Sequence, residues 1–197
     1  MFNQHLCHNP SMESLSLSNH FLIAMPNMAD PLFAKSLVFV CEHGEHGTMG
    51  VIVNKPSGLV MAQLFDQIDL PLQDDSLKAA PVFFGGPVQP DRGFVLHQPA
   101  GSWQSSLLVT DEIALTTSKD VLQAVSEGRG PGTLLISLGY ASWTAGQIED
   151  EIGENAWLTV PARADIIFSL PAEERYDAAM ALLGFDPALL SGDIGHA

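Results

Sequence analysis

The chain has 197 residues, of which 46% are hydrophobic and 16% charged, a balance typical of folded globular proteins and unlike that of disordered chains. Its formal net charge is −15, which opposes direct binding to nucleic acid or to an anionic membrane, because both need a basic protein surface. The apolar runs are also far shorter than the roughly 20 residues of a membrane helix. We therefore expect a cytoplasmic protein with no membrane partner.

The first 14 residues look unlike the rest, and we interpret them as a flexible N-terminal extension. No linker or internal repeat divides residues 15–197, which indicates a single domain. The two cysteines, Cys7 and Cys41, cannot form a disulfide framework of the kind found in small secreted proteins. This agrees with a cytoplasmic location.

Short apolar runs separated by turn-forming residues predict strands in adjacent groups. The run that starts at Leu37 is apolar at both odd and even positions, as in a strand covered on both faces. A glycine-bearing turn joins it to the next strand, which predicts a hairpin. Strands are expected at residues 20–24, 37–41, 49–54, 82–84, 93–97, 106–110 and 133–138.

Helical spacing and capping residues predict four helices between and after these strands. The first covers 59–68, the second begins at Thr117 or Ser118, and the third begins at Thr144, where Gln147 completes a capping box. The last begins at Pro171 and ends before Gly184. Grouped strands with interspersed helices favour a mixed α+β fold, with a mostly antiparallel sheet and helices packed on it.

Four longer segments are more specific than these patterns. They are Phe21-Leu-Ile-Ala-Met-Pro26, Gly50-Val-Ile-Val-Asn-Lys-Pro56, Phe84-Gly-Gly-Pro-Val88 and Gly139-Tyr-Ala-Ser-Trp143. The last is followed by Gly146-Gln-Ile-Glu149. In this order and spacing the chain resembles the YqgE/AlgH family of bacterial proteins over about residues 15–190.

The resemblance implies a sheet curled toward a barrel, and it brings no agreed catalytic residue. One family member has been described as a transcriptional regulator. The sequence shows no helix-turn-helix and no basic recognition helix, and its charge opposes DNA. An indirect effect on transcription, exerted through a protein partner, is not opposed by these features.

Cys41 and His43 stand two apart on a predicted strand, so both side chains are expected on one face. A histidine beside a cysteine lowers the thiol pKa and can produce a reactive thiolate. The apolar residues before Cys41 instead favour a buried, inert thiol. Cys41 and His43 are therefore the candidate catalytic residues of an alternative hypothesis, in which the protein is a thiol enzyme or redox sensor.

His43, His46 and His97 are possible metal ligands, with Glu42 or Asp91 as a fourth. His43 and His46 lie three residues apart in a turn that contains Gly44 and Gly47. This spacing does not fix the geometry of metal coordination. We expect neither a metal nor another cofactor.

The segment from Gly139 to Trp143 is predicted to be a loop between a buried strand and a capped helix, where ligands commonly bind in α/β proteins. It offers aromatic faces and hydrogen-bonding groups. The candidate ligand or partner contacts are Tyr140, Ser142, Trp143, Gln147 and Glu149.

These observations favour a non-enzymatic binding or adaptor protein that acts through a protein partner or small ligand, neither of which the sequence identifies. The first alternative is a thiol enzyme or redox sensor that uses Cys41 and His43. A second is direct transcriptional regulation, which the net charge opposes.

Overall fold

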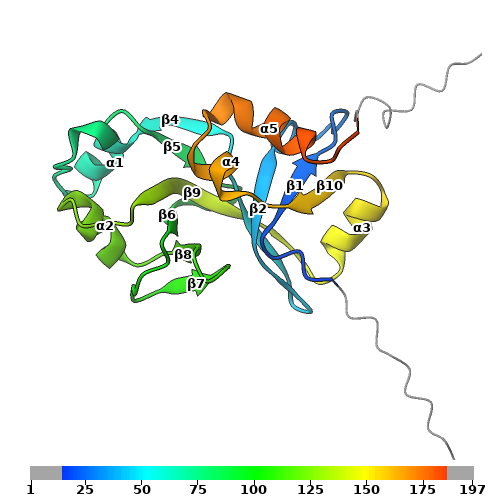
Figure 1. The fold of residues 1–197 in the computed structure, drawn as a ribbon, viewed down its shortest axis with the longest axis horizontal. Helices are drawn as coiled ribbons and strands as arrows, with labels where there is room; N and C mark the ends of the chain where they lie inside the picture. The colour runs from blue at the N-terminus through cyan, green and yellow to red at the C-terminus, as the bar shows by residue number, and fades with distance from the viewer. Residues whose placement is uncertain (1–14, 186–197) are drawn as a thin grey trace, which may run out of the picture.

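The computed structural model describes residues 15–185, in which ten strands form one sheet and five α-helices pack around it (Figure 1). The strands are β1 (His20–Ala24), β2 (Leu37–Gly44), β3 (Gly47–Ile52), β4 (Pro56–Val60), β5 (Pro81–Phe84), β6 (Val88–Gln98), β7 (Ser106–Leu108), β8 (Ala114–Thr116), β9 (Thr133–Trp143) and β10 (Trp157–Pro161). The helices are α1 (Met61–Gln67), α2 (Lys119–Ser126), α3 (Gln147–Gly153), α4 (Ala164–Phe168) and α5 (Ala172–Ala181), with one 3₁₀ turn at Asp75–Leu77. The proposed extension at residues 1–14 lies outside the described residues.

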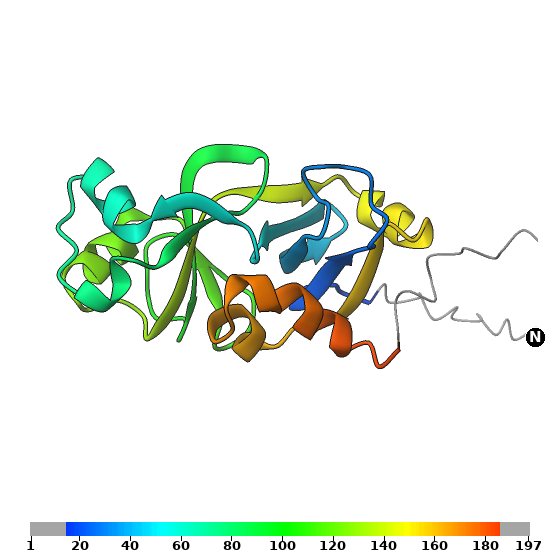
Figure 2. The ribbon, with the colours of Figure 1, turned by 90° about the horizontal axis from the view of Figure 1, so that it is seen from above.

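The sheet is almost entirely antiparallel, in the order β10-β1-β2-β3-β9-β6-β8-β7. Strand β5 adds to β9 in parallel, and β4 pairs with β5. The strands turn steadily across the molecule and form a curled half-barrel (Figures 1 and 2). The expected mixed α+β fold with a mostly antiparallel sheet is confirmed.

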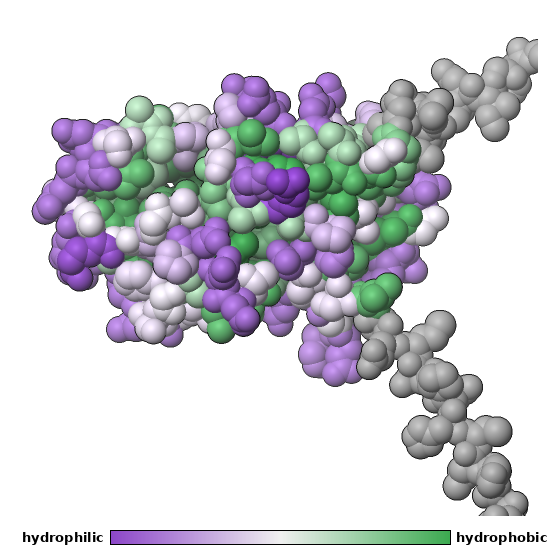
Figure 3. All heavy atoms as spheres, in the orientation of Figure 1, coloured by the Kyte–Doolittle hydropathy of each residue, from purple (hydrophilic) through white to green (hydrophobic). Residues whose placement is uncertain are grey.

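The helices occupy three places around the sheet. Helices α1 and α2 lie together at one end, α3 lies at the other, and α4 and α5 lie together beside the curled sheet (Figures 1 and 2). In the view of Figure 3, polar residues cover much of the surface, and apolar ones show through beside α5. No helix between residues 15 and 185 is long and apolar enough to cross a membrane.

Two clusters of buried residues lie on opposite faces of β1 and β2. Phe39 belongs to the larger cluster, with residues of β6, β8, α4 and α5, whereas Val38 belongs to a second one with Trp143 and Trp157. The side chains of Phe39 and Val38 are both fully buried. The prediction that β2 is covered on both faces is confirmed.

The predicted strands and helices all exist, with shifted bounds, but the sequence reading missed β4, β8, β10 and α4. It was also wrong about the segment from Gly139 to Trp143, which is not a loop. This segment continues β9 and pairs with β3 through Ala141, Ser142 and Trp143.

Gly139 allows β9 to make this continuation. Before it, the strand runs between β5 and β6, and after Tyr140 it runs beside β3. Gly139 has φ +75°, and a Cβ there would lie 2.3 Å from the carbonyl oxygen of Gly86. A Cβ on Gly86 would in turn lie 2.1 Å from the backbone of Tyr140. Only glycines allow two backbones to approach this closely, so Gly86 and Gly139 are both required for β9 to pass at this point.

Candidate functional site

A groove of about 740 Å³ opens on the sheet between the β2–β3 hairpin and strand β7. Its floor is apolar and continuous with the larger core cluster, whereas its rim is polar. The floor residues are Met49, Phe94, Leu107, Leu115 and Tyr140, and the rim includes Glu42, His46, Gln89, Arg92, Ser105, Ser106, Thr117, Ser142 and Thr144. An apolar floor with a few polar groups around it is the usual composition of a ligand site.

A break in the pairing of β6 brings a positive charge to this rim. The register between β6 and β9 shifts between Val88 and Gly93, and Gln89 has φ +48°. Arg92 lies in this irregular stretch, donates a hydrogen bond to Gln89 at 3.2 Å and lies 5.7 Å from the ring centroid of Phe94. These two contacts hold the guanidinium beside the groove.

Tyr140 supplies the main aromatic surface of the groove. Its ring meets that of Phe94 edge to face, with centroids 5.3 Å apart. Its hydroxyl makes no hydrogen bond within residues 15–185 and is not buried. Tyr140 therefore offers a fixed ring together with a free polar group.

Trp143 contributes less to the groove than the sequence reading expected, because it is a core residue. It lines one end of the groove but is only 5% exposed, packed against Phe33 and Trp157. Its indole N–H donates to Glu151 Oε2 at 3.0 Å, and the indole of Trp157 donates to the same oxygen at 2.8 Å. The carboxylate of Glu151 thus pairs two buried indoles.

Gln147 and Glu149 do not line the groove. The side chain of Gln147 accepts the backbone N–H of Thr144 and donates to Glu151, each at 3.0 Å. This is half of the predicted capping box, since the backbone N–H of Gln147 bonds the carbonyl of Thr144 and not its hydroxyl. Helix α3 accordingly begins at Gln147, three residues later than expected.

The prediction that Cys41 and His43 share a face is wrong. A register shift between Val40 and Glu42 interrupts the alternation of β2. Cys41 therefore packs into the larger core, where its thiol contacts the carbonyl of Phe39 at 3.7 Å, while His43 turns toward α3. Burial raises the pKa of the Cys41 thiol, the opposite of what a reactive thiolate requires.

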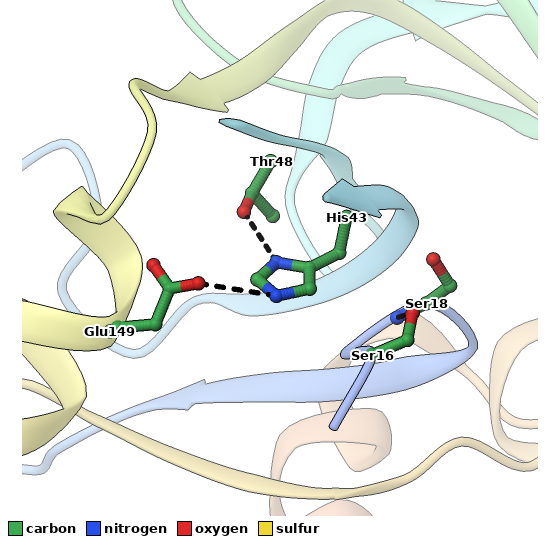
Figure 4. A network of polar contacts seen from close by, with 5 residues as sticks. All are labelled: Ser16, Ser18, His43, Thr48 and Glu149. Carbon is green, nitrogen blue, oxygen red and sulfur yellow. Dashed lines mark hydrogen bonds and ion pairs between the residues drawn. The ribbon is translucent and has the colours of Figure 1, made fainter. Parts of the chain in front are cut away.

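His43 instead lies between Thr48 and Glu149 (Figure 4). Its Nδ1 is 2.8 Å from the hydroxyl of Thr48, and its Nε2 is 3.2 Å from Oε1 of Glu149. The hydroxyl of Thr48, the imidazole of His43 and the carboxylate of Glu149 follow one another in the same order as the groups of a hydrolase triad, but the likeness ends there. Thr48 is buried and the Glu149 side chain is 48% exposed, whereas a triad buries its acid and exposes its hydroxyl. The arrangement suits a brace between the hairpin and α3.

His97 is buried in a separate network. Its Nδ1 lies 2.9 Å from the carbonyl of Pro99, so this nitrogen carries the proton, and its Nε2 accepts from the hydroxyl of Thr116 at 2.7 Å. Burial lowers the pKa of His97, and the bond to Pro99 offsets only part of that effect. Within residues 15–185, no three histidine, cysteine or acidic side chains gather as metal ligands.

The sequence reading therefore found one side of the groove, through Tyr140, Ser142 and Trp143. It missed the opposite side, which β6, β7 and β8 supply. Arg92 was a detectable signal, because it is a lone basic residue directly before the predicted strand at 93–97. The sequence contains nothing that places it beside Tyr140.

Comparisons with known proteins agree on one family. A family model described as AlgH-like matches residues 21–188. A UPF0301 protein of Chromobacterium violaceum is 77% identical over 186 residues, which are 94% of this chain and 100% of that protein. One from Laribacter hongkongensis is 57% identical over the same shares of the two chains.

Two solved structures are similar as well. The solution structure of the AlgH protein from Pseudomonas aeruginosa covers 100% of both chains at 48% identity, with a TM-score of 0.76. A crystal structure of a Corynebacterium diphtheriae protein is 20% identical, covers 89% of this chain and 92% of that one, has a TM-score of 0.69, and shows the shared fold alone. The resemblance found in the four sequence segments is thereby confirmed, and the chain belongs to the AlgH-like family.

Proposed function

We propose that this protein is a non-enzymatic adaptor that binds an extended segment of a partner protein in the groove. The observation that carries the proposal is the position of the groove beside the free edge of β7. The aromatic floor would take apolar side chains of the segment, and the polar rim would fix its direction. Tyr140, Ser142 and the exposed edge of Trp143 would be contacts, together with Arg92.

Within residues 15–185, strand β7 pairs with β8 alone and ends the sheet. The N–H of Val109 bonds the carbonyl of Ile113, and the N–H of Thr117 bonds that of Ser105. Odd-numbered residues of β7 therefore make the ladder, and the backbone groups of Ser106 and Leu108 point away from β8. An added peptide strand would pair with these groups, a common mode of peptide recognition.

Electrostatics favour a basic segment. The net charge of −15 attracts positively charged partners over long range. On the rim, Glu42 offers a carboxylate to a lysine or arginine of the segment. Arg92, on the same rim, would exclude a second cation nearby and help to set the register.

The same charges support a protein partner over nucleic acid. Lys78, Arg129 and Arg163 each form an ion pair with a neighbouring carboxylate. Arg175 is only 7% exposed. Few cations are thus left for phosphate contacts. We propose a cytoplasmic location on the same composition and on the free, buried Cys41.

The proposal is tested with displayed random peptides selected on the full chain, followed by fluorescence anisotropy with the enriched sequences. We expect enriched peptides to be basic, with alternating apolar residues. Leu108→Lys should weaken their binding about tenfold or more, because a lysine on an edge strand discourages pairing. Tyr140→Ala should weaken it similarly through the lost aromatic contact.

Ile68→Lys is the matched control, since Ile68 is another exposed apolar residue, directly after α1 and not in the groove. It should bind the peptides as the original chain does. Enrichment of no peptide, or equal binding by all three variants, would rule the proposal out.

A further inference from the structure

A second, smaller cavity of about 180 Å³ lies where α4 and α5 meet β5 and β9. It shares no lining residue with the groove. Among the residues described, 15–185, Arg175 is its only charged lining residue, and every other one is apolar, including Met61, Phe83, Leu135, Ile167 and Phe168. An arginine among lining residues that are otherwise all apolar is unusual enough to need an explanation.

Arg175 is buried without a counter-ion. It is 7% exposed, and no carboxylate within residues 15–185 lies at ion-pair distance from it. Its Nε donates to the carbonyl of Leu170 at 2.9 Å, and its Nη1 donates to that of Val53 at 2.6 Å. The guanidinium also lies 4.9 Å from the ring centroid of Phe83. These contacts stabilise the charge without neutralising it.

Part of the guanidinium has no partner. Nη2 makes no hydrogen bond within the described part of the chain, although an arginine fork can donate from all three nitrogens. Burial lowers the pKa of Arg175 to about 10, with Glu173 partly offsetting the effect, so the group is still charged at neutral pH. A mostly buried cation without an anion is costly, and an anion that enters the cavity would offset part of this cost.

We propose that this cavity binds a small monocarboxylic acid, with its carboxylate on Arg175 and its short apolar tail among the residues of α4, β5 and β9. The carboxylate would accept from Nη2, a charge-assisted bond of the stronger kind. The volume sets the size of the tail. An apolar cavity of about 150 Å³ holds a benzene molecule, so about 180 Å³ suits an acid of roughly six carbons.

The proposal differs in site and ligand from the peptide groove, and either can fail without the other. The probe is hexanoate, titrated into the full chain and followed by amide NMR shifts, with hexanol as an uncharged ligand of matched size. We expect saturable hexanoate binding with shifts around the cavity, and about tenfold or more weaker binding of hexanol, because the alcohol makes no charged contact.

Two variants locate the site. Arg175→Lys keeps the charge but loses the planar fork, and should weaken hexanoate binding about tenfold. Ala80→Leu fills part of the cavity and leaves Arg175 untouched, so it should also weaken binding. It keeps the test decisive if Arg175→Lys does not fold. No saturable hexanoate binding, equal binding of hexanol, or unchanged binding by Ala80→Leu would each overturn the proposal.

Discussion

Trp143 and Trp157 cross at nearly a right angle, with ring centroids 5.8 Å apart, and donate their indole N–H groups to one oxygen of Glu151. Both rings are almost fully buried. This pairing fixes the end of β9, the start of β10 and helix α3 relative to one another. Glu151 of α3 is therefore needed as the shared acceptor for the two buried indole N–H groups, one of which belongs to Trp143 at the end of the groove.

We predict that Glu151→Ala lowers the free energy of unfolding by about 3 kcal/mol, because it leaves two buried donors unpaired. Glu151→Gln should cost less, about 1 kcal/mol, since its amide oxygen can still accept both indoles. Urea unfolding measures these differences. The control is Glu154→Ala, whose exposed side chain makes no hydrogen bond or ion pair within residues 15–185, and which should change stability by less than about 0.5 kcal/mol. Equal effects of the two alanine variants would contradict the role given to Glu151.

The sequence predicted most strands because their apolar residues follow a period of two and end at turn formers. It failed at Cys41 and His43 because a single extra residue in β2 reverses the alternation. Nothing in the residues around position 41 marks that irregularity. It arises from pairing with β3, which a local pattern does not contain.

Only one side of the groove was predicted, because the other side also depends on strand pairing that a local pattern does not contain. Tyr140 and Ser142 were found from their own segment, while Arg92 and Leu107 reach the groove through strand pairings far along the chain. The error at Gly139 is similar. Glycine followed by polar and aromatic residues is typical of a loop, but here the glycine lets a strand pass another backbone closely.

That close approach gives a second prediction. Gly139→Ala should destabilise the fold by about 3 kcal/mol or more, through a left-handed φ and a clash with the backbone of Gly86. Gly128 has the same φ of +75° but open space around its Cβ position. Gly128→Ala should therefore cost only the conformational strain, about 1 kcal/mol. Thermal or urea unfolding compares the two, and similar losses would show that the contact with Gly86 contributes little.

The buried His97 predicts a dependence of stability on pH. Its pKa is lowered in the folded protein, so below about pH 6.5 the unfolded chain binds a proton that the folded protein does not. The stability that neutral His97 contributes is present above this pH and is lost as pH falls, by up to about 1.4 kcal/mol per pH unit. His97→Gln should flatten the profile of unfolding free energy between pH 7 and pH 5. Parallel profiles for the two proteins would mean that other groups cause the decline.

The burial of Cys41 gives the prediction that bears on the thiol alternative. Its raised pKa keeps the thiol protonated at neutral pH, and its 2% exposure blocks reagents. In a Cys7→Ser background, a maleimide should therefore react with Cys41 only when the protein opens, at a rate that rises with urea in step with unfolding. Peptides with an exposed cysteine provide the reference rate. Labelling of the native protein near that rate, with a midpoint below about pH 8.5, would identify a stabilised thiolate and restore the enzyme reading. Labelling limited by unfolding would leave the groove as the site to pursue.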